Sequence, residues 1–292
     1  MSAPTTVDEV GNRLRYLLVL SRPRFWLYLA GPVLVGVAYG AGSVDDLVTT
    51  GSVLLFAYFL VPANLLLYGV NDVFDREVDA DNPKKEGREA RYGGGRLVPT
   101  VVVGSFLLGL APFPATPRVA WPYLAGFLLL GVEYSAPPFR FKTTPPLDSV
   151  SNGLYVLPGA AAYAALAGAH PPLAALVGGW LWAMAMHTFS AIPDVEPDRE
   201  AGIRTTATVL GEGRTLAYCA ACWLLAAAAF ALVDPRLGGL LLVYPVLVAG
   251  IRRANVDVAR AYWWYPAING VVGFLLTVGG LSRLVSPGAV LP

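Results

Sequence analysis

The sequence predicts an all-helical integral membrane protein that forms a single domain over residues 1–292. Of its residues, 55% are hydrophobic and 14% are charged, with a mean hydropathy of +0.56, whereas soluble domains are about one-quarter charged. Apolar stretches long enough to cross a bilayer recur along the chain, and basic residues are concentrated in alternate loops between them. These three observations together favour a multi-span membrane protein.

Nine apolar stretches approach the length of about 20 residues that a helix needs to cross a bilayer. They lie near residues 25–42, 47–70, 98–115, 119–135, 150–168, 172–192, 215–233, 236–252 and 265–281. No soluble domain or low-complexity linker interrupts the series. We therefore predict nine transmembrane helices.

The basic residues indicate the orientation of these helices, because Lys and Arg accumulate in short cytoplasmic loops. If residues 1–24 are cytoplasmic, 18 of the 21 basic residues fall on that side, and Arg118, Arg236 and Arg283 fall outside. The protein is thus predicted to lie in the cell membrane with its N-terminus in the cytoplasm and its C-terminus outside. The net charge of +1 comes without a basic patch of interleaved aromatic residues, which argues against a nucleic-acid partner.

The two longest polar loops, 71–97 and 193–214, are both predicted to be cytoplasmic, and each opens with aspartates at helical spacing. In the first, the pattern N-D-x-x-D-x-x-x-D begins at Asn71, and its aspartates share one helix face that continues back into the membrane. The polar residues of this face are Asn64, Tyr68, Asp72, Asp75 and Asp79. A polar stripe is costly against lipid, so we expect it to line a protein interior or a wet cavity.

The second loop carries Asp194 and Asp198 at i and i+4, and the same face continues back to His187 and Ser190. Like charges at this spacing repel, so a bound cation is a natural reason to keep them together. Hard carboxylate oxygens favour Mg²⁺, which keeps water or takes phosphate oxygens as its remaining ligands. The alternatives are a solvated helix end, and ion translocation, which would place the acidic residues near mid-span rather than at the membrane rim.

A third element, Y-S-A-P-P-F-R-F-K from Tyr134 to Lys142, offers the positive charge that a diphosphate needs. Its two prolines break the helix, and Arg140 and Lys142 then alternate with aromatic residues, so both cations can point the same way. Further candidate diphosphate contacts are Arg22, Arg76 and Arg199. Each arginine taken alone is better explained as a cytoplasmic anchor.

These three motifs, with their spacing and the nine spans, resemble the UbiA superfamily of intramembrane prenyltransferases over essentially the whole chain. The resemblance implies a helical bundle around a central cavity that is capped on the cytoplasmic side, where the active site opens. It also implies a prenyl diphosphate donor and a Mg²⁺ site formed by Asn71, Asp72, Asp75, Asp79, Asp194 and Asp198. Tyr134, Arg140 and Lys142 correspond to diphosphate contacts. The expected catalytic residues are Asp72, Asp75, Asp194, Asp198, Tyr134 and His187.

Within this superfamily, the runs at 82–86, 89–92 and 192–202 look most like the lycopene elongases. That likeness implies transfer of a C5 group from dimethylallyl diphosphate to lycopene on the route to C50 carotenoids, ended by water addition or proton loss. His187 is either a base or acceptor contact, or a histidine hydrogen-bonded between helices.

Other acceptors remain open, namely an aromatic acceptor of quinone biosynthesis, a glycerol phosphate lipid and a tetrapyrrole. A membrane transporter is the alternative without catalysis. A CDP-alcohol phosphotransferase is disfavoured, because its D-G-x-x-A-R motif is missing from the sequence.

Overall fold

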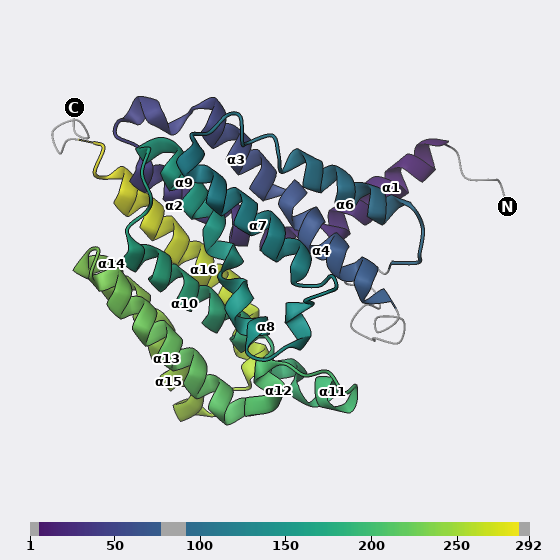
Figure 1. Ribbon diagram of the computed structural model, residues 1–292. Helices are drawn as coiled ribbons and strands as arrows, with labels where there is room; N and C mark the ends of the chain where they lie inside the picture. Colours follow the sequence, from purple (N-terminus) through teal and green to yellow (C-terminus); the bar gives the residue numbers. More distant parts are fainter. Residues whose placement is uncertain (1–5, 77–91, 286–292) are drawn as a thin grey trace.

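The structure is a computed structural model that describes residues 6–76 and 92–285, and within these ranges it consists of helices and connecting turns without strands. Figure 1 shows them as one helical bundle. The first half contains α1 (Thr6–Leu20), α2 (Trp26–Gly40), α3 (Thr50–Leu60), α4 (Pro62–Phe74), α6 (Leu97–Leu108), α7 (Trp121–Glu133) and α8 (Leu147–Val150). The second half contains α9 (Leu157–Ala167), α10 (Leu173–Ser190), α11 (Val195–Glu200), α12 (Thr206–Leu210), α13 (Glu212–Ala231), α14 (Pro235–Leu241), α15 (Val243–Ala254) and α16 (Val258–Leu281).

Five helical segments of the described chain are long and apolar enough to cross a membrane: Thr50–Phe74, Leu173–Glu200, Glu212–Ala231, Pro235–Ala254 and Val258–Leu281. The protein is therefore an all-helical integral membrane protein. The other four predicted stretches form the shorter helices α2, α6, α7 and α9, of 15, 12, 13 and 11 residues. Helix length thus confirms five of the nine predicted spans.

Proline also interrupts one of the five spanning segments, Thr50–Phe74. Pro62 separates α3 from α4, because it lacks the N–H that would continue the helical ladder. The amide of Asn64, which is 1% exposed, donates to the carbonyls of Phe59 (3.3 Å) and Leu60 (3.0 Å) across this break. The side chain of this predicted cavity residue therefore bonds backbone at the helix break and is not offered to a ligand.

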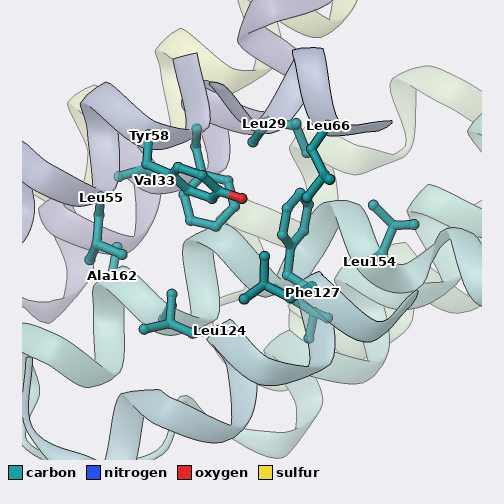
Figure 2. Packing of buried hydrophobic residues seen from close by; sticks show 14 of the residues in the cluster. Leu29, Val33, Leu55, Tyr58, Leu66, Leu124, Phe127, Leu154 and Ala162 are labelled. Carbon is teal, nitrogen blue, oxygen red and sulfur yellow. The ribbon is translucent and has the colours of Figure 1, made fainter. Parts of the chain in front are cut away.

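Two apolar cores hold the bundle together. In the first, shown in Figure 2, Phe127 of α7 packs edge-on against Phe59 of α3 with ring centroids 4.8 Å apart. The second joins α10, α13, α15 and α16 around the stacked rings of Trp223, Tyr244 and Tyr265. The first core thus packs α3 and α4 against α7, and the second packs α10 against the C-terminal helices.

Small residues allow the closest helix approach, as is common in membrane bundles. A Cβ on Gly36 of α2 would come within 2.1 Å of the Gly159 carbonyl oxygen of α9. The C-terminal ends of α4, α7 and α10, which carry the three motifs, lead into the end of the bundle where α8, α11 and α12 gather (Figure 1). The fold thus brings the described parts of the three motifs toward one end of the bundle.

Candidate active site

The first aspartate motif lies at the C-terminal end of α4. Asn71 and Asp72 belong to its last turn, and Asp75 is the residue that ends the helix. Asp72 is buried, with 2% of its surface exposed, and Asp75 is half-buried. A helix C-terminus carries partial negative charge, so carboxylates there need a cation nearby. Asp79 lies outside the described residues.

The segment that follows α7 supplies these cations. Arg140 donates to Asp75 Oδ1 at 2.9 Å, and the Lys142 ammonium contacts the other oxygen of Asp75 and also Asn71 Oδ1 at 3.1 Å. Ser135 Oγ donates to the same Asn71 oxygen at 3.2 Å. The two motifs, more than 60 residues apart, therefore meet as the sequence predicts, and Ser135 joins them as an additional contact.

Backbone conformation sets the two site arginines apart. Among the described residues, only Arg22 (φ 49°), Arg140 (φ 42°) and Asn255 are non-glycine residues with positive φ. Such conformations are costly for residues with a Cβ and are concentrated at functional sites. Arg22 precedes α2, and its guanidinium lies 4.5 Å from the ring centre of Tyr68 on α4. This contact places both residues directly below the aspartates of α4.

The oxygens of Asn71 and Asp75 suit a magnesium ion. They converge on one cation, the Lys142 ammonium, and carboxylate and amide oxygens are hard ligands of the kind that Mg²⁺ takes. Within residues 6–76 and 92–285, however, no three His, Cys, Asp or Glu side chains are grouped closely enough to hold one ion. The donor set fits the metal, but among the residues that the structure describes Asp72 and Asp75 are not gathered with Asp194 and Asp198 into a single cage.

The second aspartate motif continues from α10 through the short turn Ile192–Asp194 into α11. Asp194 and Asp198 are both half-buried. The guanidinium of Arg199 donates to the Thr208 carbonyl at 3.1 and 2.8 Å and to Glu196 at 2.8 Å. This predicted diphosphate contact links α11 to α12 in the structure.

Arg76, another predicted diphosphate contact, is exposed and lies beside Gly94, where an added Cβ would come within 2.6 Å of the Arg76 Cζ.

Tyr134 and His187 form a pair between α7 and α10. Their Tyr134 Oη and His187 Nε2 atoms are 2.9 Å apart, and the rings meet edge-on at 5.7 Å. A hydroxyl and an imidazole at this distance can pass a proton between them.

Sequence reasoning missed Asp148, which is 3% exposed on α8. It accepts hydrogen bonds from the Thr206 backbone N–H (2.7 Å) and Thr206 Oγ1 (2.5 Å) at the start of α12. Burial raises the pKa of this carboxyl, and the hydrogen bonds from Thr206 oppose that effect. Asp148 thereby connects the segment that carries Arg140 and Lys142 to the segment that follows Asp198.

Similarity to known proteins decides the family of this chain. The model of the UbiA prenyltransferase family matches residues 29–281. The chain belongs to the UbiA prenyltransferase family. Membership makes this protein a prenyltransferase and agrees with its membrane-spanning helices.

Relatives within the UbiA family are similar over nearly the full length. The chain is 68% identical over 277 residues to the lycopene elongase/hydratase of Haloferax volcanii, covering 95% of this chain and 92% of that one. It is 68% identical over 272 residues to the lycopene elongase/hydratase of Halobacterium salinarum, covering 93% and 98%. A solved UbiA homologue from Archaeoglobus fulgidus, bound to GPP and Mg²⁺, has a TM-score of 0.73 at 22% identity and covers 92% of this chain and 99% of its own.

Proposed function

We propose that this UbiA prenyltransferase transfers a dimethylallyl group from dimethylallyl diphosphate to lycopene, with addition of water, in a Mg²⁺-dependent reaction. The observation that carries the proposal is the 68% identity, over more than 90% of both chains, to two proteins named lycopene elongase/hydratase. The Archaeoglobus fulgidus homologue with GPP and Mg²⁺ bound supports the donor class and the metal.

The donor site of the proposal is the cluster at the end of α4 together with the second aspartate motif. Asn71, Asp72, Asp75, Asp79, Asp194 and Asp198 would hold Mg²⁺. When bound, the metal neutralises the diphosphate and so makes it a better leaving group. The two cations that now pair with Asp75 would turn to the diphosphate oxygens, because Arg and Lys both bind phosphate well. Arg22 would add charge from the side of α2.

The transfer itself begins when the C–O bond of the donor breaks, releasing diphosphate and leaving an allylic cation. A terminal double bond of lycopene then forms the new C–C bond, which leaves a tertiary cation on the acceptor. Water adds to that cation and loses one proton. In this proposal the Tyr134–His187 pair, whose Oη and Nε2 atoms are in hydrogen-bond contact, would take this proton: the tyrosine hydroxyl would accept it from water and pass its own proton to His187 Nε2.

The proposed topology keeps nine spans with the N-terminus in the cytoplasm and the C-terminus outside. Its support is that α2, α7 and α9 are extended by flanking 3₁₀ turns, namely Pro23–Phe25, Arg118–Ala120 and Ser151–Val156. Further support is that most basic residues of the sequence fall in the loops predicted to lie on the same side as the three motifs. The active site then opens to the cytoplasm.

The test supplies membranes that contain the protein with Mg²⁺, dimethylallyl diphosphate and either lycopene or 4-hydroxybenzoate, and identifies the products by mass. We expect hydroxylated C45 and C50 carotenoids from lycopene, none after chelation of Mg²⁺, and little product when geranyl diphosphate replaces the C5 donor. Product on the aromatic acceptor alone would overturn the acceptor assignment.

A further inference from the structure

A cavity of about 530 Å³, here called the groove, is lined by α2, α9, α10 and the C-terminal helices. On α2 its lining residues include Tyr28, Gly31, Val35 and Tyr39, and these recur every three or four positions along one face. On α16 they include Asn269, Gly270, Gly273 and Thr277, again on one face. The cavity therefore follows two neighbouring membrane helices along much of their length.

The two ends of this groove lie at opposite membrane faces. Arg24, which precedes α2, lines one end, and Arg283, which follows α16, lines the other. From Tyr28 to Tyr39 the α2 helix rises about 16 Å at 1.5 Å per residue, roughly half of the 30 Å bilayer core. At the catalytic end, the ring of Tyr28 meets that of Tyr155, 6.4 Å away. The groove thus runs from the level of Tyr28 and Tyr155 toward the far membrane face.

The walls of the groove suit a long, thin hydrocarbon. A Cβ built on Gly31, Gly270 or Gly273 would have no atom within 4 Å, so these three glycines border open space. The main polar group midway, Asn269, donates to Tyr28 Oη and accepts from Tyr244 Oη, both at 2.8 Å. Its amide is therefore already hydrogen-bonded and does not oppose an apolar guest.

Hydroxyl groups and a guanidinium gather at the far end. The Arg283 Cζ lies 5.3 Å from the ring centre of half-buried Tyr39. Thr277 Oγ1 donates to the Gly273 carbonyl at 2.8 Å, and its oxygen keeps the capacity to accept. A purely hydrocarbon chain has no use for such groups, whereas a chain that ends in a hydroxyl can bond with them.

The proposed reaction produces such a chain. Lycopene has two identical ends, and one turnover converts one of them into an elongated, hydroxylated end. For the second turnover, the unreacted end must lie at the diphosphate site, so the hydroxylated end points away from it. That direction is the one along which the groove runs.

We propose that Tyr39, Thr277 and Arg283 form a subsite that binds the hydroxylated end of the C45 acceptor during the second elongation. The inference rests on the proposed function and adds a residue set that distinguishes the second step from the first. One hydrogen bond to the hydroxyl changes affinity by about two- to tenfold.

The test measures kcat/KM separately for lycopene and for the purified hydroxylated C45 acceptor. Tyr39→Phe removes the hydroxyl and keeps the ring, and Arg283→Leu removes the guanidinium. We expect either change to lower turnover of the C45 acceptor about fivefold and that of lycopene less than twofold. The control is Arg236→Leu, which removes an exposed arginine at the start of α14 and should change turnover of neither acceptor. Equal effects on both acceptors, or no effect on the C45 acceptor, would overturn the subsite.

A second variant tests the groove itself. Gly273→Leu places a side chain in the open space and favours the helix, while Gly250→Leu on exposed α15, also without a neighbour within 4 Å, is the control. Gly273→Leu should bind dimethylallyl diphosphate with Mg²⁺ as wild type does and lose turnover of both acceptors. Normal turnover of both acceptors by Gly273→Leu would refute the claim that the acceptor occupies the groove, without refuting the proposed function. Wild-type protein that forms no carotenoid product refutes the proposed function instead.

Discussion

Replacing Lys142 by Met is expected to tighten Mg²⁺ binding by the donor-free enzyme and to weaken its reaction with the donor. The Lys142 ammonium contacts Asn71 Oδ1 and Asp75, the same oxygens that would hold the metal, so lysine and metal compete. The Lys142 and Asp75 side chains are only 11% and 16% exposed. A charge-assisted hydrogen bond in such surroundings is worth about 1.5–3 kcal/mol.

Arg140 still neutralises Asp75 in this variant, so the lower part of that range applies and Mg²⁺ affinity should rise about tenfold. Turnover should fall, because the diphosphate loses one of its cations. Titration calorimetry of detergent-solubilised protein with Mg²⁺ measures the first effect. Arg204→Met, which removes an exposed charge from another loop, is the control and should leave the affinity unchanged. Unchanged or weaker Mg²⁺ binding by Lys142→Met would refute the assignment of Asn71 and Asp75 as ligands.

The other predictions concern side chains around this centre. Asp148→Ala should destabilise the fold by about 1–3 kcal/mol in thermal unfolding, because the Thr206 donors lose their buried acceptor; an unchanged midpoint would contradict this. Burial raises the pKa of Asp148, so this carboxyl binds its proton more readily in the folded protein than in the unfolded chain. The stability of the wild type relative to Asp148→Asn should therefore rise as pH falls through the raised pKa toward the ordinary value of about 3.9. Parallel stability–pH profiles for the two proteins would contradict this prediction. Tyr134→Phe should lower the hydroxylated share of the product while diphosphate is still released, and an unaltered product ratio would remove the Tyr134–His187 pair from the hydration step.

The contact between the acidic motif at the end of α4 and the cationic motif after α7 was predictable, because each motif has a local pattern with a clear physical meaning. Asp72 and Asp75 share a helix face, and the alternation around Arg140 points both cations one way. Because these carboxylates and cations are predicted at the same membrane face, they are expected to pair with one another. The helix itself ends at Phe74, with Asp75 as its C-cap, which is close to the predicted start of the loop at residue 71.

Other features depend on contacts that one sequence does not encode locally. Arg199 looks like a phosphate ligand beside Asp198, but the carbonyl of Thr208 lies within its reach once α12 folds back. Asn64 lies on the same helix, α4, as Tyr68 and Asp72, but its amide donates to the carbonyls of Phe59 and Leu60 across the break at Pro62. Asp148 has no periodic pattern around it. Its importance depends on Thr206, 58 residues away.

The number of spans shows the same limit. Hydropathy identifies apolar stretches, while helix length depends on where proline and 3₁₀ turns interrupt them. The stretch 98–115 is a case in point, because α6 ends at Leu108, before Pro112 and Pro114. The groove could not be predicted from the sequence either, because its lining comes from helices at both ends of the chain.

The central claim is that the two aspartate motifs act on one Mg²⁺-bound diphosphate. The most direct measurement compares carotenoid formation from lycopene by wild type, Asp75→Ala and Asp194→Ala in membranes, with the inserted protein quantified in each and Asp45→Asn, an exposed aspartate between α2 and α3, as control. We predict that both alanine variants insert normally and lose turnover, while the control keeps it. Near-wild-type turnover by Asp194→Ala would contradict the account.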